Sequence, residues 1–83
     1  MNNVLTPGKL YRIKKFVNGE DTLDNKLVGL PTNTTLLCLT TKNSKDYGFL
    51  FTDCFFLYGE KTIKISLTES NSVLSINKVL EEV

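Results

Sequence analysis

The sequence feature that most constrains the fold is one strand–turn–strand pattern. In Lys61–Leu67, KTIKISL, the isoleucines and Leu67 fall on one face and the polar residues on the other, which predicts a half-buried β-strand. The apolar run Cys54–Tyr58 precedes it, and only Gly59-Glu60 separates the two segments. A two-residue loop with glycine first is typical of a type II′ turn. We therefore expect an antiparallel hairpin at this point of the chain.

Two stretches upstream of this hairpin also predict strands. Thr34–Thr41, TTLLCLTT, is rich in β-branched residues and would have apolar side chains on both faces of a strand. This pattern predicts a central strand that is covered on both faces and ends at the polar turn KNSKD. YGFLF follows, and it either continues as one long bent strand or breaks at the Thr52-Asp53 step. Because adjacent Phe55 and Phe56 cannot both face one core, we expect the register to shift close to this step. A bulge there would supply the curvature of a small barrel.

The first third of the chain contains one strong turn signal. Asn18-Gly19 predicts a hairpin, because both residues tolerate the positive φ of a type I′ turn. The polar segment EDTLDNKLVGLP follows it. We expect this segment to form a long loop with a short return strand near Lys26–Val28.

The C-terminal segment SVLSINKVLEEV fits two structures. A helix would bring its valines, Ile76 and Leu80 onto one side, whereas the alternation of Leu74, Ile76 and Leu80 suits a strand. We favour a short 3₁₀ turn around Ser70–Val73 followed by a last strand, since this arrangement completes a small barrel best.

Composition excludes several classes of function. The chain has 83 residues and a net charge of +1, so we expect a single domain over residues 1–83 with no strong field for nucleic acid or lipid. No stretch approaches the roughly 18 apolar residues of a membrane span, and the amino terminus has no signal-peptide pattern. We expect a soluble, unexported, cytoplasmic protein without a membrane partner.

Catalytic and metal-binding signatures are also missing from the sequence. The chain has no histidine, and its two cysteines, Cys38 and Cys54, lie in apolar runs where a reduced cysteine acts as a small buried side chain. The acidic segment EDTLDN lacks the spacing of a calcium loop, and no glycine-rich loop leads into a helix. We therefore expect no enzyme, no cofactor and no metal.

The predicted elements describe an all-β protein, namely a small five-stranded SH3-like antiparallel barrel, with a short C-terminal helical turn as an option. The sequence resembles the small SH3-like β-barrel accessory proteins of tailed bacteriophages. The resemblance lies in TPGKLYRIKK, an acidic loop, LPTNTTLLCL, FFLYGEKTIKI and a final INKVLEEV. It implies an accessory protein of the infected bacterial cytoplasm that inhibits or modulates a host protein, for host takeover or against a defence system, with no catalytic residues to carry over.

The basic-aromatic segment KLYRIKKF, residues 9–16, supports two interpretations. As a nucleic-acid site, its four cations would neutralise phosphates while Tyr11 or Phe16 stacks a base. As an ordinary strand, it would place Tyr11, Ile13 and Val17 in the core, and its cations would protect a sheet edge. We favour the ordinary strand, because the carboxylates that follow Asn18-Gly19 would lie across the predicted turn and neutralise the patch.

Aromatic residues are concentrated between positions 47 and 58, where six of them occupy twelve positions. A strand alternates its faces, so Phe55, Phe56 or Tyr58 is expected to be partly exposed, as interface residues are. We predict a protein partner or a homo-oligomer. The predicted partner-binding residues are four aromatic anchors with two cations for steering: Tyr11, Tyr47, Phe56 and Tyr58, with Arg12 and Lys14.

Two other functions stay open at this point. One is a barrel that binds single-stranded nucleic acid through residues 9–16, which predicts an affinity that falls steeply with salt. The other is an oligomeric sponge for a small ligand such as a nucleotide messenger, which requires a pocket at an oligomer interface.

Overall fold

The computed structural model describes residues 5–46, 48–68 and 76–83. Across these residues it is an all-β structure with one helical turn, α1 (Ile76–Val79). The described residues form seven strands, where the sequence analysis expected five. The strands are β1 (Leu10–Ile13), β2 (Val17–Asp21), β3 (Leu27–Leu30), β4 (Thr35–Asp46), β5 (Phe49–Tyr58), β6 (Lys61–Leu67) and β7 (Leu80–Glu82).

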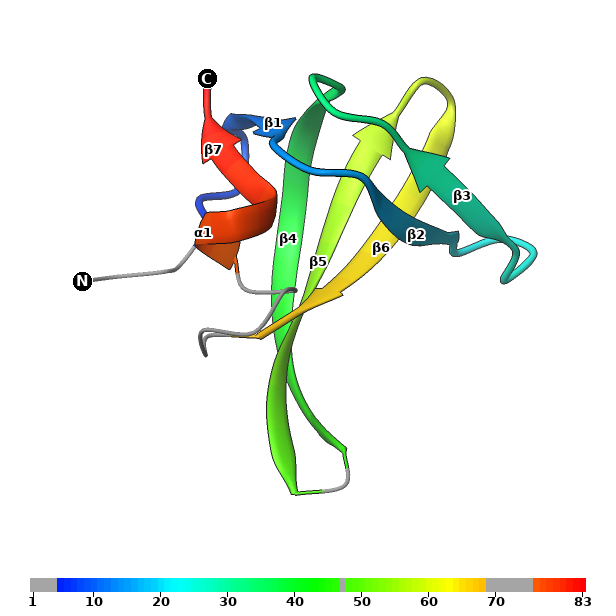
Figure 1. The fold of residues 1–83 in the computed structure, drawn as a ribbon. Coiled ribbons are helices and arrows are strands. Elements are labelled where there is room, and N and C mark those ends of the chain that lie inside the picture. Colours follow the sequence, from blue (N-terminus) through cyan, green and yellow to red (C-terminus); the bar gives the residue numbers. More distant parts are fainter. Residues whose placement is uncertain (1–4, 47, 69–75) are drawn as a thin grey trace.

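The seven strands form one antiparallel sheet in the order β3-β2-β6-β5-β4-β1-β7. The sheet curls into a half-barrel, with β3 and β7 at its two edges and α1 leading into β7 (Figure 1). Inward-facing side chains fill the curl. The largest fully buried ones are Ile13, Leu30, Leu36, Cys38, Cys54, Phe56, Ile63, Ile65, Leu67 and Val79.

The predicted hairpin between β5 and β6 is confirmed. Tyr58 pairs with Lys61 and Cys54 with Ile65, so the register is the one that the alternation of the second strand predicts. Gly59 has a φ of 63°, as the first position of a type II′ turn requires. Upstream, β5 continues through Thr52-Asp53 as one long strand.

The expected end of β4 at KNSKD is wrong. These residues stay in the strand and pair with β5 as far as Asp46 and Phe49, and the two strands extend together beyond the rest of the sheet (Figure 1). The expected cover on both faces of β4 is also wrong, because Leu39 is 40% exposed. The register shift lies in β4, between Cys38 and Thr40, and not in β5. Phe55 and Phe56 alternate on β5, with Phe56 buried and Phe55 half-buried, so β5 needs no shift of its own.

The Asn18-Gly19 turn is a second correction. Both residues lie inside β2, where Gly19 pairs with Val28. The chain reverses after β2 instead, with Asn25 at a φ of 59°. Gly19 is needed for space, because a Cβ there would lie 2.2 Å from Cγ2 of Ile63. The return strand β3 begins one residue later than predicted and ends at Leu30.

The last strand of the C-terminal segment is confirmed as β7, which pairs with β1 along Tyr11, Arg12 and Ile13. The 3₁₀ turn expected around Ser70–Val73 lies outside the described residues. No helix in the described part of the chain has the length and apolar character of a membrane span.

Candidate protein-binding face

The basic strand β1 is paired with acidic residues from the end of the chain. Nη2 of Arg12 lies 2.7 Å from Oε2 of Glu81, and its Nε donates a hydrogen bond to the same oxygen at 2.8 Å. Nζ of Lys9 lies 3.9 Å from Oε2 of Glu82. Lys9 and Arg12 therefore each have a carboxylate partner on β7, which reduces the charge available for phosphates.

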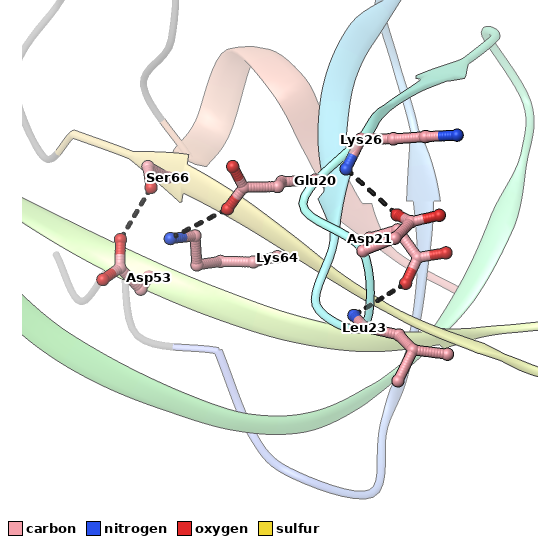
Figure 2. A network of polar contacts seen from close by, with 8 residues as sticks. Glu20, Asp21, Leu23, Lys26, Asp53, Lys64 and Ser66 are labelled. Carbon is pink, nitrogen blue, oxygen red and sulfur yellow. Dashed lines mark hydrogen bonds and ion pairs between the residues drawn. The ribbon is translucent and has the colours of Figure 1, made fainter.

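The carboxylates that we expected to cover this patch have other partners. Oε1 of Glu20 lies 3.3 Å from Nζ of Lys64, and Oδ2 of Asp21 lies 3.7 Å from Nζ of Lys61. Figure 2 shows the side chains of Glu20 and Lys64 pointing toward each other. The expectation of neutralisation across an Asn18-Gly19 turn was wrong, because these two positions lie in a strand and the acidic residues face β6.

Tyr11 and Phe56 were predicted as surface anchors, and the structure corrects both. Each is buried in the core, and their rings meet edge to face with centroids 6.4 Å apart. The hydroxyl of Tyr11 accepts a hydrogen bond from the backbone N–H of Thr6 at 2.8 Å. Phe55, and not Phe56, is the partly exposed member of the adjacent pair. Neither predicted anchor offers its ring to a partner in this fold.

The other predicted residues that the structure describes come from different parts of the sheet: Tyr58 ends β5, Arg12 lies on β1 and Lys14 directly follows β1. Tyr58 is half-buried and packs against the core. Arg12 is half-buried on the outer face, whereas Lys14 is exposed and its backbone N–H donates to the carbonyl of Val79 at 2.7 Å. Tyr47 lies outside the described residues. The core positions predicted for Tyr11, Ile13 and Val17 under the ordinary-strand interpretation are confirmed. The edge position predicted for the same strand is wrong, because β1 lies between β4 and β7.

An apolar strip crosses the outer face of the sheet at the same end. We define the outer strip as Val83, Leu10, Leu37 and Leu57. Leu37 lies between Leu10 on β1 and Leu57 on β5, and the N–H of Val83 donates to the carbonyl of Leu10 at 3.0 Å. Direct cross-strand neighbours place their side chains side by side on one face. These four residues therefore form one continuous row.

The outer strip is accessible to solvent. Val83 is 63% exposed, Leu10 46% and Leu57 39%, and Leu37 is half-buried. Leu10, Leu37 and Leu57 each have a buried neighbour along the strand, which explains why these three side chains point outward. A contiguous row of exposed apolar side chains is a mark of an interaction surface, whereas isolated ones are common on any protein.

The bulge in β4 widens this apolar surface. Leu39, the extra residue of the bulge, is 40% exposed, and half-buried Phe55 pairs with the following residue, Thr40. On one side the strip is bordered by the Arg12–Glu81 pair. A bulge re-aims a side chain next to a functional site, and here it adds a leucine to the outer face.

Two open hollows lie on the other half of the sheet. The larger, of about 550 Å³, is lined by the β2–β3 loop and the β5–β6 turn, and the smaller, of about 250 Å³, lies between β2, β3 and β6. In the larger one, Oδ1 of buried Asp21 accepts a hydrogen bond from the N–H of Leu23 at 2.9 Å (Figure 2). Oδ1 of Asp24 accepts one from the N–H of Lys26 at 3.0 Å. Both carboxylates therefore accept hydrogen bonds from the backbone of the β2–β3 loop and stabilise its conformation.

The described residues contain no cluster of metal ligands and no activated thiol. Across residues 5–46, 48–68 and 76–83, no three histidine, cysteine, aspartate or glutamate side chains gather in a way that could hold a metal ion. Cys38 and Cys54 are free and buried. Burial raises the pKa of Cys38, and it raises the pKa of Cys54 to about 12, with smaller contributions from Cys38 and Asp53. Thiols with raised pKa values are poor nucleophiles at neutral pH.

Comparisons with protein-family models, with curated proteins and with solved structures find no match to this chain. The outer strip was missed in the sequence because its members come from four strands. The sequence signal for an exposed apolar surface was the run Leu36-Leu37-Cys38-Leu39. We assigned this run to a strand covered on both faces.

Proposed function

We propose that this protein is a non-enzymatic binding module whose outer strip docks on a protein partner. The observation that carries the proposal is the row of Leu57, Leu37 and Leu10 across β5, β4 and β1, continued by Val83 directly after β7. Fully burying one leucine side chain contributes roughly 1.5–3 kcal/mol, so completing the burial of partly exposed leucines favours association. A sheet also presents such a row rigidly, which lowers the entropy lost on binding.

The charges around the strip favour a protein partner over a nucleic acid. Arg12 beside Leu10 is paired with Glu81 beside Val83, so the border carries both signs. A border of mixed sign suits the polar rim of a protein interface, whereas phosphate binding requires an excess of cations. The steering role predicted for Arg12 remains part of this proposal, because rim charges act mainly on the rate of association.

The biological setting is proposed from the sequence resemblance. A phage-type accessory protein that inhibits or modulates a host protein in the infected bacterial cytoplasm needs a rigid surface and no catalytic group. The SH3-like architecture is part of the same proposal, and the curled antiparallel sheet with its β5–β6 hairpin supports it. The sheet order β3-β2-β6-β5-β4-β1-β7 adds strands at both edges to the predicted five.

Affinity capture of a bacterial protein tests the proposal. The tagged protein is compared with a Leu10→Ser/Leu57→Ser variant in nuclease-treated lysate. We expect the wild-type protein to retain a partner that the variant releases.

A further inference from the structure

The strand β3 forms one edge of the sheet, and its sequence leaves that edge unprotected. β3, LVGL, pairs with β2 on one side and lies at the end of the strand order. It carries no charged residue. The opposite edge, β7, carries Glu81 and Glu82, which pair with Arg12 of β1 and with Lys9 just before it. Charged side chains are the usual protection of an edge against pairing with another chain, and only one of the two edges has it.

The turn between β2 and β3 determines which residues of β3 form backbone hydrogen bonds with β2. The N–H of Asp21 donates to the carbonyl of Lys26 at 2.9 Å, so these two residues form a hydrogen-bonded pair. Such pairs alternate along an antiparallel ladder, and the next one is therefore Gly19 with Val28. Leu27 and Gly29 consequently direct their N–H and C=O groups away from β2. The free edge presents two donors and two acceptors.

The outer face beside this edge carries two exposed apolar side chains. Leu27 is 73% exposed and Phe16 57%. The ring of Phe16 covers Gly29, because a Cβ on Gly29 would lie 3.1 Å from Cζ of the ring. On the inner face, half-buried Val28 packs against the core. The edge thus has an aromatic ring over one residue and an uncovered leucine two residues away.

We propose that two copies of this chain pair through β3, antiparallel, about a two-fold axis at Val28. In this register Leu27 lies opposite Gly29 of the second copy, and these are the residues whose backbone groups point outward. Each of the two symmetric pairs exchanges two hydrogen bonds. Leu27 of one copy then lies beside the Phe16 ring of the second copy, which covers Gly29 of that copy. The two-fold axis repeats this contact with the copies exchanged.

The occupant is a second copy because the edge is complementary to itself. An isologous interface requires each feature to meet its counterpart across the axis, and here free donors meet free acceptors while a leucine meets a ring. The net charge of +1 adds little repulsion between copies. The inference does not rest on the proposed function, because the outer strip lies across β7, β1, β4 and β5, toward the other edge.

Disulfide trapping tests the register. Val28 would face itself across the axis in a non-hydrogen-bonded pair, where Cα atoms lie about 4.5 Å apart, and this separation permits a disulfide. We expect Val28→Cys to form a covalent dimer in a glutathione redox buffer. The matched control is Leu23→Cys, which lies in the β2–β3 loop and is 92% exposed. Equal cross-linking of the two variants would overturn the register.

Sedimentation equilibrium tests the association itself. We expect the wild-type protein to dimerise as its concentration rises, and Leu27→Lys to weaken the dimer at least tenfold. Leu23→Lys adds the same charge in the loop and should leave the dimer unchanged. A wild-type protein that stays monomeric up to millimolar concentration, or a dimer equally sensitive to both lysine variants, would overturn the proposal. Circular dichroism of each variant separates lost pairing from lost folding.

Discussion

Arg12 and Glu81, which lie 69 positions apart in the sequence, face each other across β1 and β7 with a charge-assisted hydrogen bond of 2.8 Å. Nη2 of Arg12 lies 2.7 Å from the same carboxylate oxygen. This contact adds to the backbone pairing of β7 with β1. It also explains why the cations of β1 form part of a mixed-sign border.

A double-mutant cycle on Arg12 and Glu81 measures this pair. The side chains are 43% and 42% exposed, so solvent screening limits the coupling to roughly 0.2–1 kcal/mol. We expect urea unfolding of Arg12→Ala, Glu81→Ala and the double variant to give a coupling in this range, reduced at 1 M salt. A coupling of zero at low salt would mean that Arg12 is available to other anions.

Gly19→Ala should destabilise the fold. The new methyl group would lie 2.2 Å from Cγ2 of Ile63, a fully buried side chain, and overpacking of this kind costs roughly 1–3 kcal/mol. We expect a loss of unfolding free energy in this range, measured by urea denaturation. Asn18→Ala, one position away on the exposed face, should change stability by less than about 0.5 kcal/mol.

Ile63→Ala provides the control for the cause. It removes the methyl group that Gly19→Ala would strike, so the glycine substitution should cost less in the Ile63→Ala background than in the wild-type protein. An equal cost in both backgrounds would mean that the backbone conformation of Gly19, and not the space beside it, is what the alanine disturbs.

Local patterns predicted the parts of the fold that depend on neighbours in sequence. The β5–β6 hairpin was predictable because alternation in Lys61–Leu67 and a glycine at the first turn position agree with each other. Asn18-Gly19 gave the same local signal and was wrong. A glycine that provides a positive φ and one that provides space for a distant Ile63 have the same appearance in a sequence.

The candidate site could not be predicted in the same way. The outer strip needs β7 beside β1, and this pairing joins residues from opposite ends of the chain. It also needs Leu37 to point outward, which follows from burial of Leu36 and Cys38. The aromatic residues were predicted as anchors because they are numerous, but Tyr11 and Phe56 are used to fill the core.

Cys54 should resist alkylation in the folded protein. Its thiol is buried and its pKa is raised to about 12 by burial, then by Cys38 and Asp53. We expect iodoacetamide at pH 8 to modify the native protein only as fast as it unfolds, and to modify both cysteines readily in urea. Mass spectrometry after timed quenching measures this. Rapid native modification of Cys54 would contradict its burial.

The same shift predicts a pH dependence of stability. Burial raises the pKa of the Cys54 thiol from 9.0 to about 12. Below pH 9 the thiol is protonated in both the folded and the unfolded state, so the unfolding free energy keeps its full value there. Between about pH 9 and pH 12 the unfolded state loses its proton first, so the unfolding free energy falls as pH rises. The unfolding free energy should fall less in Cys54→Val than in the wild-type protein, measured by urea unfolding at pH 8 and pH 10.5. An equal fall in both proteins would contradict the assignment of this pH dependence to Cys54.

The central claim is that the outer strip binds a protein, and quantitative affinity capture tests it most directly. Tagged wild-type protein, the Leu10→Ser/Leu57→Ser variant and the control Leu23→Ser are incubated with nuclease-treated bacterial lysate. Leu23 is exposed but lies in the β2–β3 loop, away from the strip. Mass spectrometry then measures the amount of each captured protein relative to the bait.

We expect one near-stoichiometric protein with the wild type and the Leu23→Ser control, reduced at least tenfold with Leu10→Ser/Leu57→Ser. All three baits should keep the same far-ultraviolet circular dichroism. Equal capture by all three baits, or recovery of nucleic acid alone from a lysate not treated with nuclease, would contradict the claim.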